Sequence, residues 1–334
     1  MRPRRRHQPM TPRRWRPGWR RMPSVRALAC PASLKGVLSA REAAAALAEG
    51  LQAWAAVDQL PVADGGEGTL DVLHHALGGE WQEADVSDAF GHRRRARWLE
   101  LSFGHAVVEA AEAIPLDRER LDPLAASSRG LGELILAVGS PRELLVGLGG
   151  TANVDGGAGL LDVLDGLPVP TRVVCDVDVP LLDAARVFAA QKGATPGEAA
   201  ELEARLAARS DLAPYAQLPG AGAAGGLGAA FASLGAELVP GAARVLDLVG
   251  FDPSPYDVVV TGEGTVDATT VRGKAPGEVA RRCRVAGVRC VVFGGRVVEP
   301  VEGVETIALS GEPARARADL MELGLGLGRF HPAG

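Results

Sequence analysis

Three short segments rich in glycine and carboxylates have the residue types that could bind phosphate. Residues 64–73 read DGGEGTLDVL and residues 155–164 read DGGAGLLDVL, with eight of ten positions identical. A partial third copy occurs where GEGTLD at 66–71 returns as GEGTVD at 262–267. Glycines let a backbone approach a ligand closely, and a helix that begins after them favours an anion at its N-terminus. We therefore interpret these segments as candidate phosphate-binding loops.

The carboxylates in these segments need a role of their own, because they would repel a bare phosphate. A nearby carboxylate can hold Mg²⁺ or accept a proton from a substrate hydroxyl. The alternative is structural, since an aspartate before a helix also caps it. One such loop alone would favour the structural interpretation, whereas three related loops in one chain favour phosphoryl chemistry.

Lysine is rare in this chain, and its placement is unusual. Only three of the 36 basic residues are lysines, and Lys35, Lys192 and Lys274 each lie next to a glycine. Arginine serves wherever a generic surface cation suffices, so a retained lysine indicates a compact ammonium donor near a phosphate or carboxylate. Chance survival of three lysines is the alternative.

Apolar strands alternate with helices along most of the chain, which predicts an α/β fold with a largely parallel sheet. Ser39 with Glu42, and Thr195 with Glu198, have the spacing of capping boxes and predict two helix starts. The strand-rich stretch at 81–112 indicates a second domain inserted into the first. Ligands of α/β proteins bind at the carboxyl ends of parallel strands, which is where the glycine loops are expected.

Composition narrows the possible functions. The net charge is −5, but residues 1–26 contain ten arginines and no Asp or Glu, so the rest of the chain is strongly acidic. An acidic body argues against nucleic acid as a partner, and no apolar run approaches the length of a membrane span. Four cysteines without CxxC spacing are expected to be buried thiols. We expect residues 1–23 to be a disordered basic tail, either a targeting segment or an over-extended start with Met22 as the later initiator.

Two glycine motifs suggest other nucleotide-binding folds and are set aside. Residues 220–225 match GxGxxG but follow QLP instead of an apolar strand, so they are either a phosphate-binding helix start or a close helix contact. Gly273-Lys274 is followed by Ala275, which excludes a P-loop. His74 and His75 are expected on an exposed helix face.

Six motifs occur in a fixed order between about residues 28 and 297: PVADGGEGT, GGTANVDGGAG, VVCDV, AQKGATP, PGAGAAGGLG and TGEGTVD…GKAP. Together they resemble the bacterial glycerate kinase family, of the type that makes 2-phosphoglycerate. The resemblance implies a Rossmann- or flavodoxin-like parallel-sheet domain with a second, inserted α/β domain of mixed sheet. The corresponding boundaries are 24–78 plus 245–328 for the first domain and 79–244 for the inserted one.

The resemblance also implies what the protein binds. ATP and Mg²⁺ would be the cosubstrates and D-glycerate the acceptor, with neither nucleic acid nor membrane as a partner. The location would be cytoplasmic, and a homodimer is one expected assembly.

Site residues follow from the same motifs. The resemblance assigns catalysis to Lys35, Asp64, Asp267 and Lys274, with Asp64 and Asp267 also as metal ligands. It assigns nucleotide binding to Gly65, Gly66, Gly149, Gly150, Thr151, Gly156, Gly157 and Lys192. It assigns substrate binding to Ser33, Glu67, Asp155, Asp176 and Glu263. In such a site the lysines would neutralise charge and the glycines would cradle phosphates, because positioning and charge stabilisation dominate phosphoryl transfer.

Ala32, Val154 and Val179 depart from the family pattern, and they leave alternatives open. The first is an active glycerate kinase. The second is a kinase of another small hydroxy- or sugar-acid with a reshaped pocket. The third is a catalytically silent protein that binds a phosphorylated metabolite.

Overall fold

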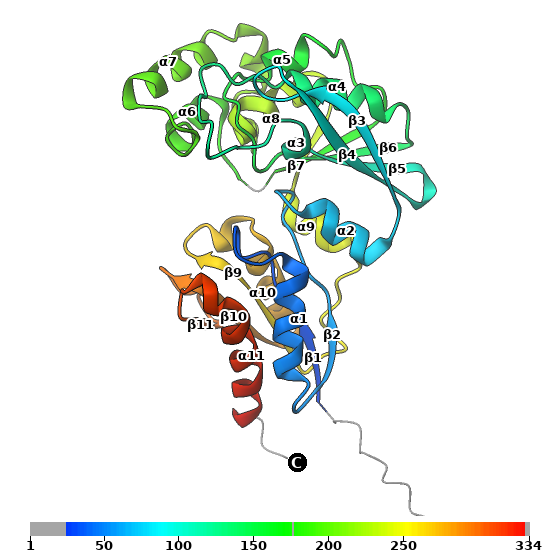
Figure 1. Cartoon of the computed structure of the whole chain (residues 1–334), viewed down its shortest axis with the longest axis vertical. Helices are drawn as coiled ribbons and strands as arrows, with labels where there is room; N and C mark the ends of the chain where they lie inside the picture. The colour runs from blue at the N-terminus through cyan, green and yellow to red at the C-terminus, as the bar shows by residue number, and fades with distance from the viewer. Residues whose placement is uncertain (1–24, 176, 331–334) are drawn as a thin grey trace, which may run out of the picture.

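The computed structural model describes residues 25–175 and 177–330. Within these residues the strands form two sheets, one of five strands and one of six, and Figure 1 shows them in two parts of the molecule joined by helices. In the same residues, no helix has both the length and the apolar character needed to cross a membrane. The predicted disordered tail at 1–23 lies outside the described residues.

The first sheet is wholly parallel, as the alternation of strands and helices predicts. Its order is β2 (Ala56–Gln59), β1 (Arg26–Ala29), β9 (Val258–Val266), β10 (Arg289–Val297) and β11 (Glu305–Ala308). Counted along the chain this is the 2-1-3-4-5 order of flavodoxin-like folds, and the order reverses between β1 and β9. The predicted Rossmann- or flavodoxin-like sheet is therefore confirmed, and its topological switch point lies between those two strands.

Helices cover both faces of this sheet because its strands are apolar on both sides. Val258 and Val260 pack with α1 (Ala40–Leu51) and α11 (Ala316–Leu327), whereas Val259 packs toward α10 (Ala275–Ala286). The predicted capping box begins α1: Ser39 and Glu42 exchange hydrogen bonds between side chain and backbone. The resulting cores hold this layer together.

The second sheet is mixed. Its order is β3 (Glu80–Ser87), β4 (Arg93–Leu101), β5 (His105–Glu109), β6 (Glu143–Gly147), β7 (Thr171–Cys175) and β8 (Glu237–Pro240). The first three strands pair antiparallel and the last four pair parallel, which confirms the predicted mixed sheet. The helices of this part are α3 (Ala110–Ala113), α4 (Arg129–Val138), α5 (Ala158–Leu161), α6 (Ala184–Phe188), α7 (Pro196–Ala207) and α8 (Ala223–Ser233).

Two helices, α2 (Thr69–Leu77) and α9 (Gly241–Leu248), lie between the two parts of the molecule (Figure 1). Leu70 and Leu73 of α2 belong to the same buried cluster as Leu99, Val107 and Leu145 of the second sheet. The division into 24–78 with 245–328 and 79–244 stays a prediction. The packing attaches α2 to the second sheet although it precedes that sheet in the chain.

The three related glycine segments fold differently. The first leads into α2, which has nine residues, and the second leads into α5, which has four. The third is not a turn followed by a helix, because residues 262–266 continue β9 and pair in register with β10. The expectation of a third phosphate-binding loop is therefore wrong. Residues 262–266 belong to the sheet, where they pair with β10.

The other glycine motif, at 220–225, is a close packing contact. A Cβ on Gly225 would lie 2.3 Å from the carbonyl oxygen of Asn153, and one on Gly222 would lie 2.4 Å from that of Pro180. The second alternative for this motif is thus favoured. All four cysteines are buried, as expected, and Cys30, Cys283 and Cys290 form no disulfide.

Candidate active site

The carboxyl ends of β1, β2 and β9 bring the predicted residues together at the switch point of the first sheet. A cavity of about 570 Å³ lies between α1 and α2, and a second of about 380 Å³ lies over the ends of β9, β10 and β11. Four residues line both cavities: Ser33, Lys35, Asp64 and Glu263. Ligands of open α/β sheets bind at this position, so the junction of the two cavities is the candidate active site.

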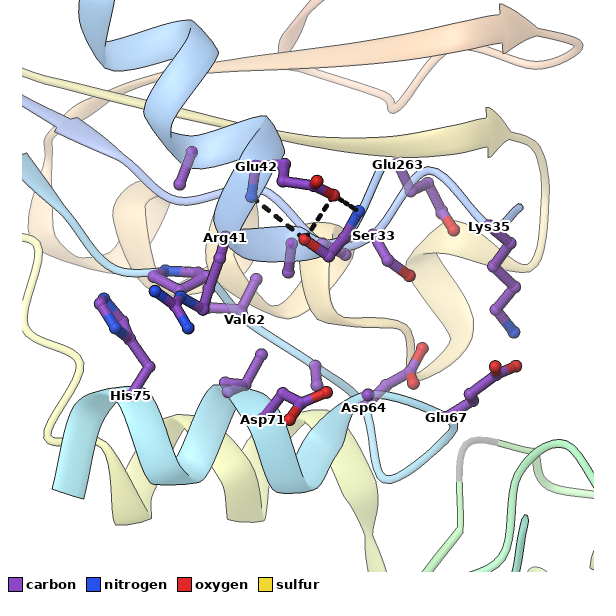
Figure 2. Close-up of a pocket in the computed structure, with 18 of the residues that line it drawn as sticks. Ser33, Lys35, Arg41, Glu42, Val62, Asp64, Glu67, Asp71, His75 and Glu263 are labelled. Carbon is purple, nitrogen blue, oxygen red and sulfur yellow. Dashed lines mark hydrogen bonds between the residues drawn. The ribbon is translucent and has the colours of Figure 1, made fainter. Parts of the chain in front are cut away.

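The first cavity brings a cation and two carboxylates together. Figure 2 shows Lys35, Asp64 and Glu67 pointing into the same space, although Lys35 follows β1 and the other two follow β2. Arg41 and His75 line the outer part of this cavity. A ligand there would meet charges of both signs.

The second cavity contains a half-buried ion pair. The Nζ of Lys274 lies 3.3 Å from Oε2 of Glu263, and the hydroxyl of Thr270 donates a 2.8 Å hydrogen bond to Oε1. Burial raises the pKa of Glu263, and the charge of Asp64 acts in the same direction, whereas Lys274 and Thr270 oppose the shift. The Glu263 carboxylate thus has a partner on each oxygen and orients the lysine.

Asp267 lies beside this pair and lines neither of the two cavities. Its Oδ1 lies 4.0 Å from Nζ of Lys274 and accepts hydrogen bonds from the backbone and the hydroxyl of Thr269, at 2.8 and 2.5 Å. The Thr269 hydroxyl holds the pKa of Asp267 below its usual value. The geometry therefore favours Glu263 over Asp267 at the junction.

The glycines of the first loop shape the backbone. The N–H of Gly65 donates to the hydroxyl of Thr69 (3.1 Å), and the N–H of Gly66 donates to Oδ1 of Asp64 (3.3 Å). The Thr69 hydroxyl in turn donates to the carbonyl of Gly66 (2.7 Å). Because both N–H groups already have acceptors in the loop, this geometry does not offer them to a phosphate as expected.

The first loop is in close backbone contact with the second sheet. A Cβ on Gly149 would lie 2.4 Å from Cα of Gly66, and one on Gly147 would lie 2.4 Å from the carbonyl oxygen of Gly65. A Cβ on Gly241, at the start of α9, would lie 1.8 Å from the carbonyl oxygen of Asp64. These glycines allow the loop to lie against β6 and α9. Gly150 lies beside Glu67 in the same contact.

Asp155 is saturated with hydrogen bonds. Its carboxylate accepts from the backbone N–H groups of Ser128, Gly157 and Gly159, from the Ser128 hydroxyl, and from the Asn153 amide, at 2.7–3.1 Å. The N–H of Gly156 donates to the carbonyl of Gly225 (3.0 Å). The predicted substrate contact of Asp155 and the phosphate contacts of Gly156 and Gly157 are not supported, because these groups are occupied inside the second domain.

Lys192 is also internal to the second domain. Its Nζ donates to the carbonyl of Asn153 (2.6 Å) and to the hydroxyl of Thr151 (3.4 Å), and the side chain is buried. Burial lowers the pKa of Lys192 to about 7. The expected nucleotide contact of Thr151 and Lys192 stays a prediction, and Asp176 lies outside the described residues.

The sequence interpretation missed Arg41, His75, Arg296 and Glu109. The first three line the cavities from helix or strand positions without a motif, although His75 is exposed on α2 as expected. Glu109 is the buried last residue of β5. Only the fold places these residues near the loops.

Oxygen donors for a divalent cation come from Asp64 and Glu263 at the junction. Over residues 25–175 and 177–330, no group of three or more His, Cys, Asp or Glu side chains could hold a metal ion. Magnesium needs fewer, since it commonly takes one or two carboxylates and completes its shell with water and substrate phosphates. The residues present fit that pattern.

The chain is similar to proteins of one family from several bacteria. The profile of the Glycerate kinase family matches residues 27–169 and 165–312. The Glycerate 2-kinase of Escherichia coli (strain K12) is 35% identical over 303 residues, covering 75% of this chain and 80% of that protein. The Glycerate kinase of Bacillus subtilis (strain 168) is 35% identical over 329 residues, covering 82% and 85%.

A solved structure has the same fold. It is the "crystal structure of putative glycerate kinase 2 from Salmonella typhimurium LT2", which superposes with a TM-score of 0.75 at 29% identity. The match covers 91% of this chain and 97% of that one.

Proposed function

The chain belongs to the glycerate kinase family, and we propose that it transfers a phosphoryl group from ATP to D-glycerate, with 2-phosphoglycerate as the favoured product. The observation that carries the proposal is the junction of two cavities at Ser33, Lys35, Asp64 and Glu263. A phosphoryl transfer needs two substrates whose reacting ends meet, and a pair of cavities with a shared charged boundary provides that arrangement.

The two lysines are suited to stabilise the transferring group. Lys35 lines both cavities, and Lys274 lines the second with its ammonium oriented by Glu263. Charge on the transferring phosphoryl is spread over its oxygens, so fixed cations on both sides of the junction lower the barrier. This assignment uses the lysines that the sequence singled out, except Lys192.

Asp64 is the best-placed carboxylate to receive the proton of the substrate hydroxyl. Its carboxylate accepts the Gly66 N–H and faces both cavities, whereas both oxygens of Glu263 are engaged by Thr270 and Lys274. A general base must lie within hydrogen-bond reach of the proton that it removes, and Asp64 lies where the substrates would meet.

Magnesium, when bound with the nucleotide, would neutralise phosphate charge at the junction. Asp64 would hold it through one oxygen, and Glu263 through the remaining lone pair of an oxygen that has a single partner, in place of the expected pair Asp64 and Asp267. The remaining contacts would come from water and the nucleotide.

The test is turnover by the purified full-length chain with D-glycerate, ATP and Mg²⁺, read as ADP release. Coupling to an enolase distinguishes 2-phosphoglycerate, which that enzyme dehydrates, from 3-phosphoglycerate. The Asp64→Asn chain is the control for contaminating kinases. ADP release no faster than the ATPase background without glycerate would overturn the proposal.

A second acceptor is favoured by one observation. Among the three positions that depart from the family pattern, Ala32 lines the first cavity, whereas Val154 is buried in a core of the second domain. Ala32 presents a small apolar side chain to the cavity beside Ser33, which would suit a larger hydroxy-acid. A panel of small hydroxy- and sugar-acids in the same assay separates the two acceptors.

A further inference from the structure

A buried glutamate of the second sheet contacts the start of the helix that follows the first glycine loop. Glu109 is the last residue of β5 and is 4% exposed. Its Oε2 accepts the N–H of Gly68 at 3.2 Å, and its Oε1 accepts the N–H of Leu70 at 2.5 Å. Gly68 is the N-cap residue of α2 and has no side chain of its own for capping, and Leu70 is the second residue of the helix.

The side chain of Glu109, from the second sheet, thus takes the place of a capping side chain at the N-terminus of α2. The first N–H groups of a helix have no partner within the helix, and a carboxylate is favoured there by the helix dipole. The same position was a candidate phosphate site from the sequence. With the Glu109 carboxylate present, a second anion at the N-terminus of α2 would meet like charge.

We propose that Glu109 is a positioning residue for the active site: by holding the start of α2 from the second sheet, it fixes the loop that carries Asp64 and Glu67. This inference rests on the proposed function. The loop has Asp64 four residues before Gly68 and Glu67 immediately before it, so a shift of the α2 N-terminus moves both carboxylates relative to Lys35. Glu109 itself lies behind the loop and lines neither cavity.

Charged groups around Glu109 come from three elements. Glu112 of α3 and Asp71 of α2 raise its pKa, Arg97 of β4 interacts with it favourably, and the amides of Gly68 and Leu70 lower the pKa. Burial is the largest influence and raises the pKa of Glu109 to about 7. The carboxylate therefore gains its proton near neutral pH, and protonation removes one of the two acceptors.

Activity and stability should change with pH in opposite directions. The folded pKa of about 7 lies above the ordinary value of 4.5, so the unfolded chain releases this proton first. The contribution of Glu109 to stability is therefore fully present below pH 4.5 and is lost as the pH rises through 7. A purely stabilising role leaves the kcat of the folded enzyme independent of this titration, whereas a positioning role predicts that kcat falls below pH 7.

The experiment compares Glu109→Gln with the wild type and with Glu112→Gln, using the full-length chain. Glu112 is a neighbouring carboxylate that pairs with Arg97 (2.9 Å) and does not contact the loop. An amide at position 109 can accept one backbone N–H but turns its own N–H₂ toward the other. We expect Glu109→Gln to lower kcat about tenfold or more at pH 8 with a KM for D-glycerate changed less than about threefold, because the lost interaction acts on the transition state.

Three further readouts separate positioning from folding. The fall of kcat below pH 7 should be present in the wild type and absent in Glu109→Gln. In Glu112→Gln it should move to lower pH, because the charge of Glu112 raises the pKa of Glu109. Glu109→Asp should recover part of the activity. Hydrogen exchange of the Gly68 and Leu70 amides should accelerate in Glu109→Gln. Unchanged kcat in a folded Glu109→Gln chain overturns the inference.

The experiment also distinguishes failure of the inference from failure of the proposed function. A wild-type chain without glycerate-dependent ADP release refutes the proposed function alone. In that case faster exchange of the Gly68 and Leu70 amides in Glu109→Gln still supports the positioning contact, and unchanged exchange overturns it. If Glu109→Gln does not fold, two results remain. Partial activity of Glu109→Asp and a fall of the wild-type kcat below pH 7 support the inference, and their absence overturns it.

Discussion

The two copies of the glycine segment, 64–73 and 155–164, share eight of ten residues and have different environments. Asp64 lines both cavities, and its carboxylate accepts a hydrogen bond from the N–H of Gly66. Asp155 accepts five hydrogen bonds inside the second domain. The same Asp-Gly-Gly sequence therefore lines a cavity in one place and stabilises the fold in the other.

Neighbouring residues account for the difference. The fourth position is Glu67 in the first copy and Ala158 in the second, and the sixth is Thr69 against Leu160. The Thr69 hydroxyl closes the first loop on itself, whereas Leu160 is fully buried in the core of the second domain. Both copies keep the hydrogen bond from the N–H of the second glycine to Oδ1 of the aspartate, whereas the φ of that glycine is positive only in Gly157. The surroundings of the carboxylate decide its use.

The same substitution in the two copies should have opposite effects. Asp64→Asn is expected to lower kcat about a thousandfold, the scale of losing a positioned general base, and to leave the unfolding free energy nearly unchanged. Steady-state kinetics and urea unfolding measure the two quantities. A kcat within tenfold of the wild type would place the catalytic carboxylate elsewhere, with Glu263 next to be tested.

The matched change in the second copy, Asp155→Asn, should lower the unfolding free energy by about 2–4 kcal/mol, because buried donors lose a charged acceptor. The kcat of the folded fraction should stay within about threefold. Urea unfolding followed by kinetics below the transition checks both. A stable Asp155→Asn chain with greatly reduced kcat would contradict the contrast between the copies.

Lysines sharpen the comparison. Lys274→Ala should lower kcat about a hundredfold, the scale of losing one charge-stabilising donor. Lys192→Met should change kcat little, because Lys192 is buried beside the second copy. Initial rates at saturating D-glycerate and ATP measure both, and a larger loss in Lys192→Met would restore its predicted role in nucleotide binding.

Lys192 should instead appear in the pH dependence of stability. Burial lowers its pKa to about 7 from 10.5, so between these values the unfolded chain carries the extra proton. The wild type should therefore gain stability as the pH rises from 7 toward 10, and Lys192→Met should lack that part of the gain.

Glycine substitutions should give the smallest effects. A Cβ on Gly157 would lie 2.3 Å from Cβ of Ala230, and its φ is +70°. A Cβ on Gly66 would meet only Asp64 Oδ1, at 3.2 Å, and Cα of Gly149, at 3.8 Å. We expect Gly157→Ala to lower the unfolding free energy by about 1–3 kcal/mol and Gly66→Ala to cost less. Thermal unfolding of the two chains checks the order.

Local sequence signals predicted the elements well. The capping boxes at Ser39–Glu42 and Thr195–Glu198 begin α1 and α7 as expected, because each uses residues within four positions. The alternation of strands and helices along the chain likewise predicted the parallel sheet. The strand over YDVVVTGEG was predicted, but the third phosphate-binding loop expected at 262–267 was wrong, because pairing with β10 overrides a sequence that forms a loop and a helix start at 66–69.

The site was predicted only in part, for a physical reason. Lys35, Asp64 and Glu263 were found because motifs mark them. The state of Asp155 depends on Ser128, 27 positions earlier, and the contact of Glu109 with Leu70 spans 39 positions. Such long-range hydrogen bonds leave no spacing for a sequence pattern to detect.

Because glycine has no Cβ, Gly147, Gly149 and Gly241 restrict how the first loop can move against the second sheet. Backbone lies directly on backbone there, so the first loop cannot slide over the second sheet without a clash. If the two parts of the molecule hinge open and shut around a substrate, Asp64 and Glu67 travel as one rigid body with β6 and α9. Lys35 and Lys274 belong to the other part of the molecule, which contains the five-stranded sheet. The amplitude of such a hinge motion would set the distance from the two lysines to the carboxylates of Asp64 and Glu67.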